Sequence, residues 1–200
     1  MPHPKKTTQQ TMKIYLTDQK NKFKQHLDFL KTKKIMDYDK TRLTEKITTI
    51  EINTTKKIDQ LNLEFLFDYH IFPDNIMTFK SQWTEENRKM KIGDTIAQQV
   101  YIPPTKTFSQ KIIFGVRINE IIDQANRKGF SYETLEGHVE KGISTFTIEQ
   151  LDNKLVFMVQ TYSTPGNILT KLAGPIFSVP YQTFCTKNAL NNVKRQLENQ

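Results

Sequence analysis

Hydrophobic residues near the start of the chain recur at the spacing of one helix face. Phe23, Leu27 and Leu30 are separated by four and then three residues, which places them on the same side of an α-helix. Polar side chains fill most of the positions between them. The pattern predicts an amphipathic helix over about residues 17–34.

The pattern then changes twice before residue 90. Residues 35–60 show no clear period, and we expect them to be irregular apart from one short strand near residues 47–52. Apolar and polar side chains alternate over residues 63–71, which is typical of a half-buried strand. Asp74 can cap a helix that follows and carries Trp83 on its apolar stripe.

Five further segments are predicted to be β-strands. They are residues 95–102, 111–122, 129–135, 142–150 and 154–163. The links between them are short, and Asp152-Asn153 is typical of a tight turn. Because a parallel pair needs a long crossover, the short links predict antiparallel pairing.

Helical spacing returns at the end of the chain. It predicts one helix from Pro165 to Ala173 and, after a break at Gly174-Pro175, a longer helix over about residues 176–198. One face of the predicted sheet needs a cover, and this last helix is long enough to supply it. The sequence therefore predicts an α+β fold, in which a curved antiparallel sheet of about six or seven strands grips a long C-terminal helix. This helix-grip arrangement, here with an N-terminal helical extension, leaves room for a cavity between sheet and helix.

Composition and charge divide the chain into three predicted parts. A length of 200 residues with 36% hydrophobic side chains suits one domain with a real core. We expect a disordered tail at residues 1–16, a basic helical and irregular segment at 17–60, and the helix-grip domain at 61–200. Residues 1–60 carry 14 Lys and Arg against 7 Asp and Glu, whereas residues 61–200 carry 15 against 14.

This basic first third can contact an anionic surface. We do not expect it to bind nucleic acid, because its lysines have no aromatic stacking platform beside them.

Other features exclude several classes of protein. No apolar run approaches the roughly 20 residues that span a bilayer, and the N-terminus lacks the apolar stretch of a signal peptide. The lone Cys185 cannot form an internal disulfide, and His3, His26 and His70 lack metal-ligand spacing. We therefore expect a cytoplasmic protein with no metal site and no cofactor.

Several short motifs carry a resemblance to a known family. The segment GFSYETLEGH at residues 129–138 resembles the signature of an uncharacterised bacterial and plant family, domain of unknown function nineteen-ninety. Gly142 and Phe146 are also similar to that signature. Ser163-Thr164-Pro165 resembles the family's strand-to-helix junction, and Gly174-Pro175 resembles the start of its last helix. Met36-Asp37-Tyr38 stands where the family has a short tyrosine motif after its first helix. The resemblance covers most of the chain from about residue 20.

The resemblance implies a fold and a class of ligand. The family is similar to the START-like, plant-allergen-like helix-grip superfamily, whose members typically bind lipids, sterols or other apolar molecules. Some members of that superfamily are cyclases or hydrolases. This chain departs from the family at Ile143-Ser144, where acidic residues are usual after the glycine.

The candidate ligand pocket is drawn from the inner faces of the strands and of the last helix. Its residues are Phe114, Val116, Arg117, Tyr132, Phe157 and Phe184. We expect the three phenylalanines and the valine to be largely buried, so that truncating Phe114 or Phe184 to alanine costs about 3–5 kcal/mol. Arg117 can clamp a carboxylate or phosphate at the pocket mouth. Alternatively it lies on the solvent face, which the alternation of its strand favours.

Two polar residues beside the pocket are candidates for chemistry. His138 follows Gly137 in a turn and can act as an acid, a base or a ligand. The sequence favours the alternative that its ring bonds to the turn backbone. Glu133 lies beside Tyr132, and Tyr132 is expected nearer the pocket wall than His138. Cys185 is expected to be a buried, inert thiol rather than a nucleophile.

Three functions are compatible with these features. The leading hypothesis is the binding of a small apolar or amphipathic molecule between the sheet and the C-terminal helix. The second is an enzyme of hydrolase or cyclase type on the same scaffold, which would need a cluster of convergent polar groups. The third is an interaction protein that uses the basic first third.

Overall fold

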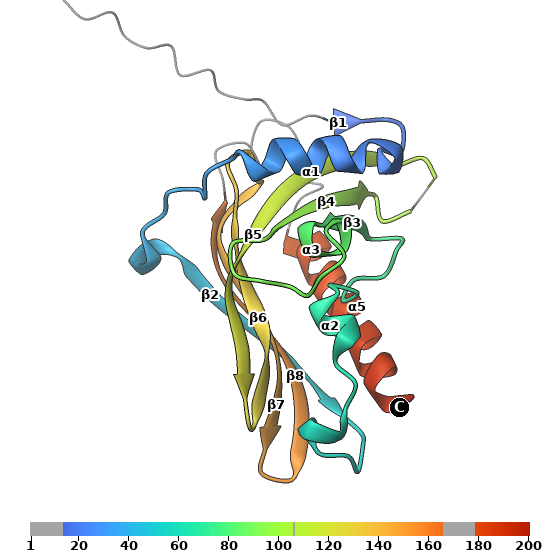
Figure 1. The fold of residues 1–200 in the computed structure, drawn as a ribbon, viewed down its shortest axis with the longest axis vertical. Coiled ribbons are helices and arrows are strands. Elements are labelled where there is room, and N and C mark those ends of the chain that lie inside the picture. The colour runs from blue at the N-terminus through green and yellow to red at the C-terminus, as the bar shows by residue number, and fades with distance from the viewer. Residues whose placement is uncertain (1–13, 106, 166–178) are drawn as a thin grey trace, which may run out of the picture.

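One antiparallel sheet of eight strands dominates the computed structural model, which describes residues 14–105, 107–165 and 179–200 (Figure 1). The strands are β1 (Ile14–Tyr15), β2 (Thr44–Ile52), β3 (Met77–Ser81), β4 (Thr95–Ile102), β5 (Gln110–Gln124), β6 (Arg127–Thr134), β7 (Glu140–Leu151) and β8 (Lys154–Pro165). Their order across the sheet is β2-β8-β7-β6-β5-β4-β3, and β1 pairs with β5 beside this path. The predicted α+β fold and antiparallel pairing are confirmed.

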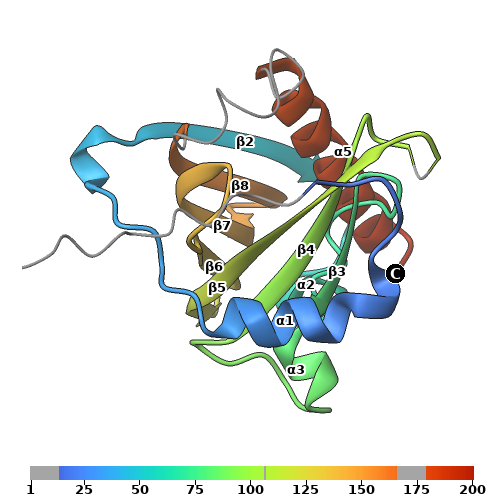
Figure 2. The same cartoon turned by 90° about the horizontal axis from the view of Figure 1, so that it is seen from above.

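Helices lie on both faces of the sheet. The α-helices are α1 (Phe23–Lys31), α2 (Glu64–Phe67), α3 (Gln82–Glu85) and α5 (Val179–Glu198), and short 3-10 turns are η1 (Lys20–Lys22), η2 (Lys40–Arg42) and η3 (Ile58–Gln60). Figure 2 shows α1 and α5 on opposite sides of β4. No helix in the described part of the chain is long and apolar enough to cross a membrane.

The inner face of the sheet packs on α5. The helix contributes Ala189, Leu190, Val193 and Leu197 to the same buried cluster as Phe114, Val116 and Phe157 of the sheet. Leu190, Val193 and Leu197 follow one another at spacings of three and four, and Ala189 is four residues before Val193, which aligns them on one side of the helix. The helix-grip arrangement expected from the sequence is therefore present.

The outer face is covered by α1, so β4 and the middle of β5 are packed against other elements on both faces. Leu27 and Leu30 of α1 pack against Ala97 of β4 and Leu135. A Cβ atom at Gly115 would lie 2.8 Å from Cδ2 of Leu30 and 2.8 Å from Cδ1 of Leu135. Glycine at this position thus allows the helix to approach the sheet closely.

Two predicted elements are wrong. Residues 63–71 form α2 and the turn that follows it instead of a strand, and their apolar side chains enter the core from both. Tyr69 lies in that turn with a left-handed φ of 67°. The helix expected after Asp74 is strand β3, which pairs with β4, and only Gln82–Glu85 are helical. Short apolar runs have no period long enough to separate the two structures.

Near the two ends of the chain, the structure matches the elements predicted from the sequence only in part. The predicted strand near residues 47–52 is longer, and as β2 it pairs with β8 along the edge of the sheet. Residues 17–60 therefore contribute both a strand and a covering helix. Within the disordered tail expected at residues 1–16, residues 14–15 instead form β1, which pairs with β5. Pro165, expected to begin a helix, is the last residue of β8. Residues 1–13 and 166–173 lie outside the described residues.

The burial of the candidate core residues is confirmed with one exception. Phe114, Val116 and Phe157 are buried, whereas the Phe184 side chain is 43% exposed. Phe184 precedes Cys185, which packs on the core. One residue turns an α-helix by about 100°, so Phe184 points away from the sheet, and its predicted burial is wrong.

These positions give a matched pair of variants. Phe157→Ala should lower the free energy of unfolding by about 3–5 kcal/mol, because the side chain is fully buried. Phe184→Ala should change it by less than about 0.5 kcal/mol. Urea denaturation followed by circular dichroism measures both values. Equal losses in the two variants would contradict the assigned faces of β8 and α5.

Candidate functional site

A small cavity lies between β4–β6 and the N-terminal part of α5. Its volume is about 140 Å³. The lining side chains come from the loop before β3, the sheet, the turn after β6 and α5, and they are Phe72, Ile76, Met77, Gln98, Val100, Phe114, Tyr132, His138, Val139, Glu140, Tyr181 and Cys185. Most of them are apolar, so the cavity is a hydrophobic site with a few polar groups in its wall.

Tyr69 fills much of the space that the sheet and α5 would otherwise leave open. Its side chain is fully buried, and its ring centroid lies 6.0 Å from that of Phe130 and 6.2 Å from those of Phe72 and Tyr132. The Nε2 atom of Gln98 donates a hydrogen bond of 2.6 Å to Tyr69 Oη. This aromatic cluster occupies space that a larger cavity would need.

Two buried phenols are held in their protonated form. Burial raises the pKa of Tyr69 well above its usual value. Burial also raises the pKa of Tyr132, although hydrogen bonds with Tyr69, Ser144 and Gln98 partly oppose this. Both side chains are therefore neutral at physiological pH and can serve as hydrogen-bond donors or acceptors.

His138 is fixed by its own turn. Its Nδ1 atom lies 3.0 Å from the backbone nitrogen and 2.9 Å from the carbonyl oxygen of Glu140, and its ring centroid is 4.8 Å from that of Phe114. Burial lowers the pKa of His138 to about 4. The imidazole is thus neutral at physiological pH and bonded to main-chain groups, as the sequence favoured.

The α5 side of the cavity holds a phenol and a thiol. Tyr181 Oη donates a hydrogen bond of 2.6 Å to the carbonyl oxygen of Tyr101 in β4, which ties the helix to the sheet. Burial raises the pKa of the Cys185 thiol to about 11. Because the thiolate is the nucleophilic form, this cysteine is a poor nucleophile at neutral pH.

The structure brings together only some of the predicted pocket residues. Phe114, Tyr132 and His138 all line the cavity. Val116 and Phe157 belong to the surrounding core without lining it. Tyr132 and His138 are both wall residues, so the expected difference between them is not seen.

Arg117 and Glu133 lie on the outer face of the sheet, at directly opposite positions of β5 and β6. The guanidinium of Arg117 donates to the carbonyl oxygen of Lys31 at 3.0 Å, at the end of α1, where a cation also interacts favourably with the helix dipole. Glu133 accepts a short hydrogen bond from Tyr38 Oη. Both side chains therefore stabilise the N-terminal segment on the sheet, away from the cavity.

Sequence patterns did not identify several wall residues. Phe72 and Ile76 lie in a loop and just before β3, where no period marks their direction. Tyr181 and Cys185 are four residues apart on α5, and this spacing is the signal that could have placed them on one helix face.

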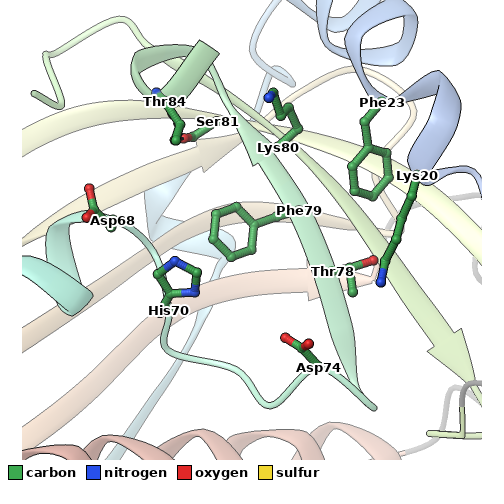
Figure 3. Close-up of a pocket in the computed structure, with 10 residues that line it drawn as sticks. All are labelled: Lys20, Phe23, Asp68, His70, Asp74, Thr78, Phe79, Lys80, Ser81 and Thr84. Carbon is green, nitrogen blue, oxygen red and sulfur yellow. Dashed lines mark hydrogen bonds between the residues drawn. The ribbon is translucent and has the colours of Figure 1, made fainter. Parts of the chain in front are cut away.

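A second depression of about 410 Å³ lies beside β3 (Figure 3). His70, Asp68 and Asp74 line it together with lysines and hydroxyl side chains. However, Lys80 pairs with Glu85 at 2.6 Å, and Ser81 caps α3 by accepting from the backbone nitrogen of Thr84. Among the described residues no group of three His, Cys, Asp or Glu could hold a metal ion. Lys80 and Ser81 are thus engaged in local structure.

Comparison with known proteins supports the fold and defines the family. The family described as Domain of unknown function (DUF1990) matches residues 61–192. No curated protein matches the sequence significantly.

Solved structures give the same architecture at low identity. A major latex-like protein from Panax ginseng superposes with a TM-score of 0.53 at 10% identity, over 77% of this chain and 97% of its own. A hypothetical protein from Helicobacter pylori superposes with a TM-score of 0.51 at 11% identity, over 82% of this chain and 96% of its own. At such identities the likeness shows the fold alone.

The lowered pKa of His138 predicts a pH-dependent stability. Below about pH 6.5 the unfolded chain binds a proton on this imidazole that the folded protein binds only near pH 4. The free energy of unfolding should therefore fall as the pH drops through this window, with a slope from His138 of at most about 1.4 kcal/mol per pH unit. Urea titrations between these pH values should show a shallower slope for His138→Asn than for wild type.

Phe184→Leu, an exposed position on α5 where no titratable group is changed, supplies the control for this measurement and should keep the wild-type slope. An unchanged slope in His138→Asn would show that the imidazole is not held neutral by the fold.

Proposed function

Because the chain belongs to the DUF1990 family and has a helix-grip fold, we propose that it binds a small apolar or amphipathic molecule between β4–β6 and α5. Proteins of this fold often bind small hydrophobic ligands. The observation that carries the proposal is the apolar cavity against α5, walled by Phe114, Tyr132 and Cys185. Ligand sites typically combine such apolar walls with a few placed polar groups.

The size of the cavity limits the part of the ligand that it can enclose. Sites for drug-sized molecules typically have about 300–1,000 Å³, whereas this one has about 140 Å³. An engineered apolar cavity of about 150 Å³ in another protein binds benzene. We therefore propose that the cavity holds one ring or a short acyl segment, with any larger remainder of the ligand outside it.

The polar wall groups favour a neutral rather than a charged ligand group. Gln98, Tyr132 and His138 can all form hydrogen bonds, and the side chains of Tyr132 and His138 are neutral at physiological pH. A hydroxyl or carbonyl group of the ligand suits them, because an unpaired charge would be costly in this apolar site. Arg117, on the outer face, does not serve as a carboxylate clamp here.

The chemistry of the wall supports binding more than catalysis. A general base or nucleophile works best with a pKa near the operating pH. The pKa of His138 is lowered to about 4 and that of Cys185 is raised to about 11. A hydrolase or cyclase on this scaffold would need groups poised between these values.

The lone cysteine reports directly on occupancy of the cavity. Toluene at saturating concentration should slow the reaction of Cys185 with a chromogenic disulfide at about pH 9, where more of the thiol is ionised, because toluene in the cavity covers the wall that carries the thiol. A Cys185→Phe variant should fill the cavity and weaken toluene binding at least about tenfold in an NMR titration. Phe184→Leu, one residue away on the exposed side of α5, should bind as wild type does.

Unchanged labelling at saturating toluene together with unchanged toluene binding in Cys185→Phe would contradict the assigned site. Native mass spectrometry of protein purified from its own host would then identify whether a different small molecule is retained. The same spectrum identifies the physiological ligand if the assignment holds.

His138 should contribute to stability more than to affinity. His138→Ala removes the hydrogen bond between Nδ1 and the backbone of Glu140, so it should lower the free energy of unfolding by about 1–2 kcal/mol. Toluene affinity should stay within a few-fold of wild type. A variant that is as stable as wild type but no longer binds would instead assign His138 a direct role in binding.

A further inference from the structure

The two most exposed large apolar side chains among the described residues lie at one end of the molecule. Phe108, between β4 and β5, is 99% exposed, and Leu16, after β1, is 81% exposed. Lys111 joins the two segments, because its Nζ atom donates to the carbonyl oxygen of Leu16 at 3.0 Å and to that of Ser109 at 2.7 Å. The Lys111 side chain itself is buried.

We call Leu16 and Phe108, with the backbone that Lys111 holds, the apolar tip. Its segments are anchored to the sheet, since β1 pairs with β5 through Ile14 and Ile112. Single exposed apolar residues are common on protein surfaces. Leu16 and Phe108, however, are both highly exposed and lie on segments that are held together, so leaving them in water is unfavourable.

Exposed cations lie close in sequence to the apolar tip. The described residues 14–24, 103–105 and 107–111 contain four lysines and one acidic residue, Asp18. Lys20 and Lys22 are exposed, whereas Lys24 pairs with Glu85 and Lys111 is the buried clamp. Protruding apolar side chains within basic surroundings complement a surface that is apolar below and anionic above.

The apolar tip also adjoins the wall of the ligand cavity. Val100 lines the cavity and precedes the loop that carries Phe108 by only a few residues. The Nδ2 atom of Asn75, next to the wall residue Ile76, contacts the carbonyl oxygen of Pro104 at 3.4 Å. Tyr181 of α5 bonds to Tyr101 in the same strand. A surface that meets the tip thus lies near one end of the cavity.

We propose that the apolar tip docks the protein on an anionic lipid membrane. Leu16 and Phe108 enter the boundary between headgroups and acyl chains, and the exposed lysines contact acidic headgroups. A protein interface of stable size would need a broader apolar core with few charges. The geometry here, two apolar side chains in basic surroundings, fits a lipid surface better.

Vesicle flotation tests this proposal. The protein should float with vesicles of phosphatidylcholine containing phosphatidylserine, and much less with phosphatidylcholine alone. The double variant Leu16→Ser/Phe108→Ser should lower the partition coefficient about tenfold or more, since it removes two inserted side chains. Raising the salt concentration to 1 M should weaken binding, because the Debye length falls to about 3 Å.

A matched double variant controls for general loss of surface hydrophobicity. Ile92 and Leu151 are 65% and 47% exposed. Ile92 precedes Gly93, which bonds to Ile118 of β5, and Leu151 lies at the β7–β8 turn, so Ile92→Ser/Leu151→Ser should bind vesicles as wild type does. Thermal unfolding checks that both double variants fold. A tryptophan at the tip adds a second readout: Phe108→Trp emission should shift to the blue on anionic vesicles, over the constant background of the buried Trp83. Ile92→Trp should not shift.

Three results would overturn the proposal. They are equal vesicle binding by the tip variant and wild type, no binding to either vesicle, and a dimer in sedimentation velocity that Leu16→Ser/Phe108→Ser abolishes. The last would assign the tip to a second copy of the chain. None of these results bears on the toluene titration, so the ligand site and the membrane contact fail or stand separately.

Discussion

The packing of Tyr69 between sheet and helix determines what this protein can hold. An antiparallel sheet crossed by one helix leaves a wedge of space, and a side chain from the turn after α2 enters that wedge. The phenol oxygen accepts from Gln98 Nε2 and the hydroxyl hydrogen-bonds with Tyr132, so a polar group can be buried there with hydrogen-bond partners. Phe72, Phe130 and Tyr132 close around the ring. The remaining cavity near α5 is consequently the size of a single ring rather than of a sterol.

The opposite face of the sheet is organised by a different contact. Gly115 lets α1 lie directly on β5, and Arg117 bonds to the carbonyl group at the end of that helix. The segment before residue 61, which the family match does not cover, thereby supplies both the cover of the outer face and the edge strand β2. Removing it would expose two apolar surfaces, so its basic character cannot be separated from its structural role by deletion. Substitutions on the exposed surface are the appropriate experiments.

Sequence patterns predicted the fold well where a long period is present. The strands over residues 95–163 and the terminal helix each repeat their apolar positions often enough to define a face. Residues 63–71 alternate as a strand does, but they bury Leu66, Tyr69 and Ile71 from a short helix and a turn. The predicted burial of Phe184 is wrong for a similar reason, since hydrophobicity alone does not show which side of a helix faces the sheet. The cavity depends on loops and on one inserted tyrosine, and these have no periodic signal; Phe114, Tyr132 and His138 were found because they lie on or beside predicted strands.

The position of α5 in the chain has a consequence for synthesis. Every strand of the sheet precedes this helix, so the ribosome releases the whole inner face, with Phe130, Phe146 and Phe157, before the segment that covers it. The helix is then fastened at its far end by Lys194 to the carbonyl oxygen of Glu51 and by Glu198 to the backbone of Asn53. Until those contacts form, a nascent chain displays an apolar sheet to other proteins, which is the state that chaperones bind. The apolar inner face is therefore removed from water when α5 packs on it, and not when the sheet forms.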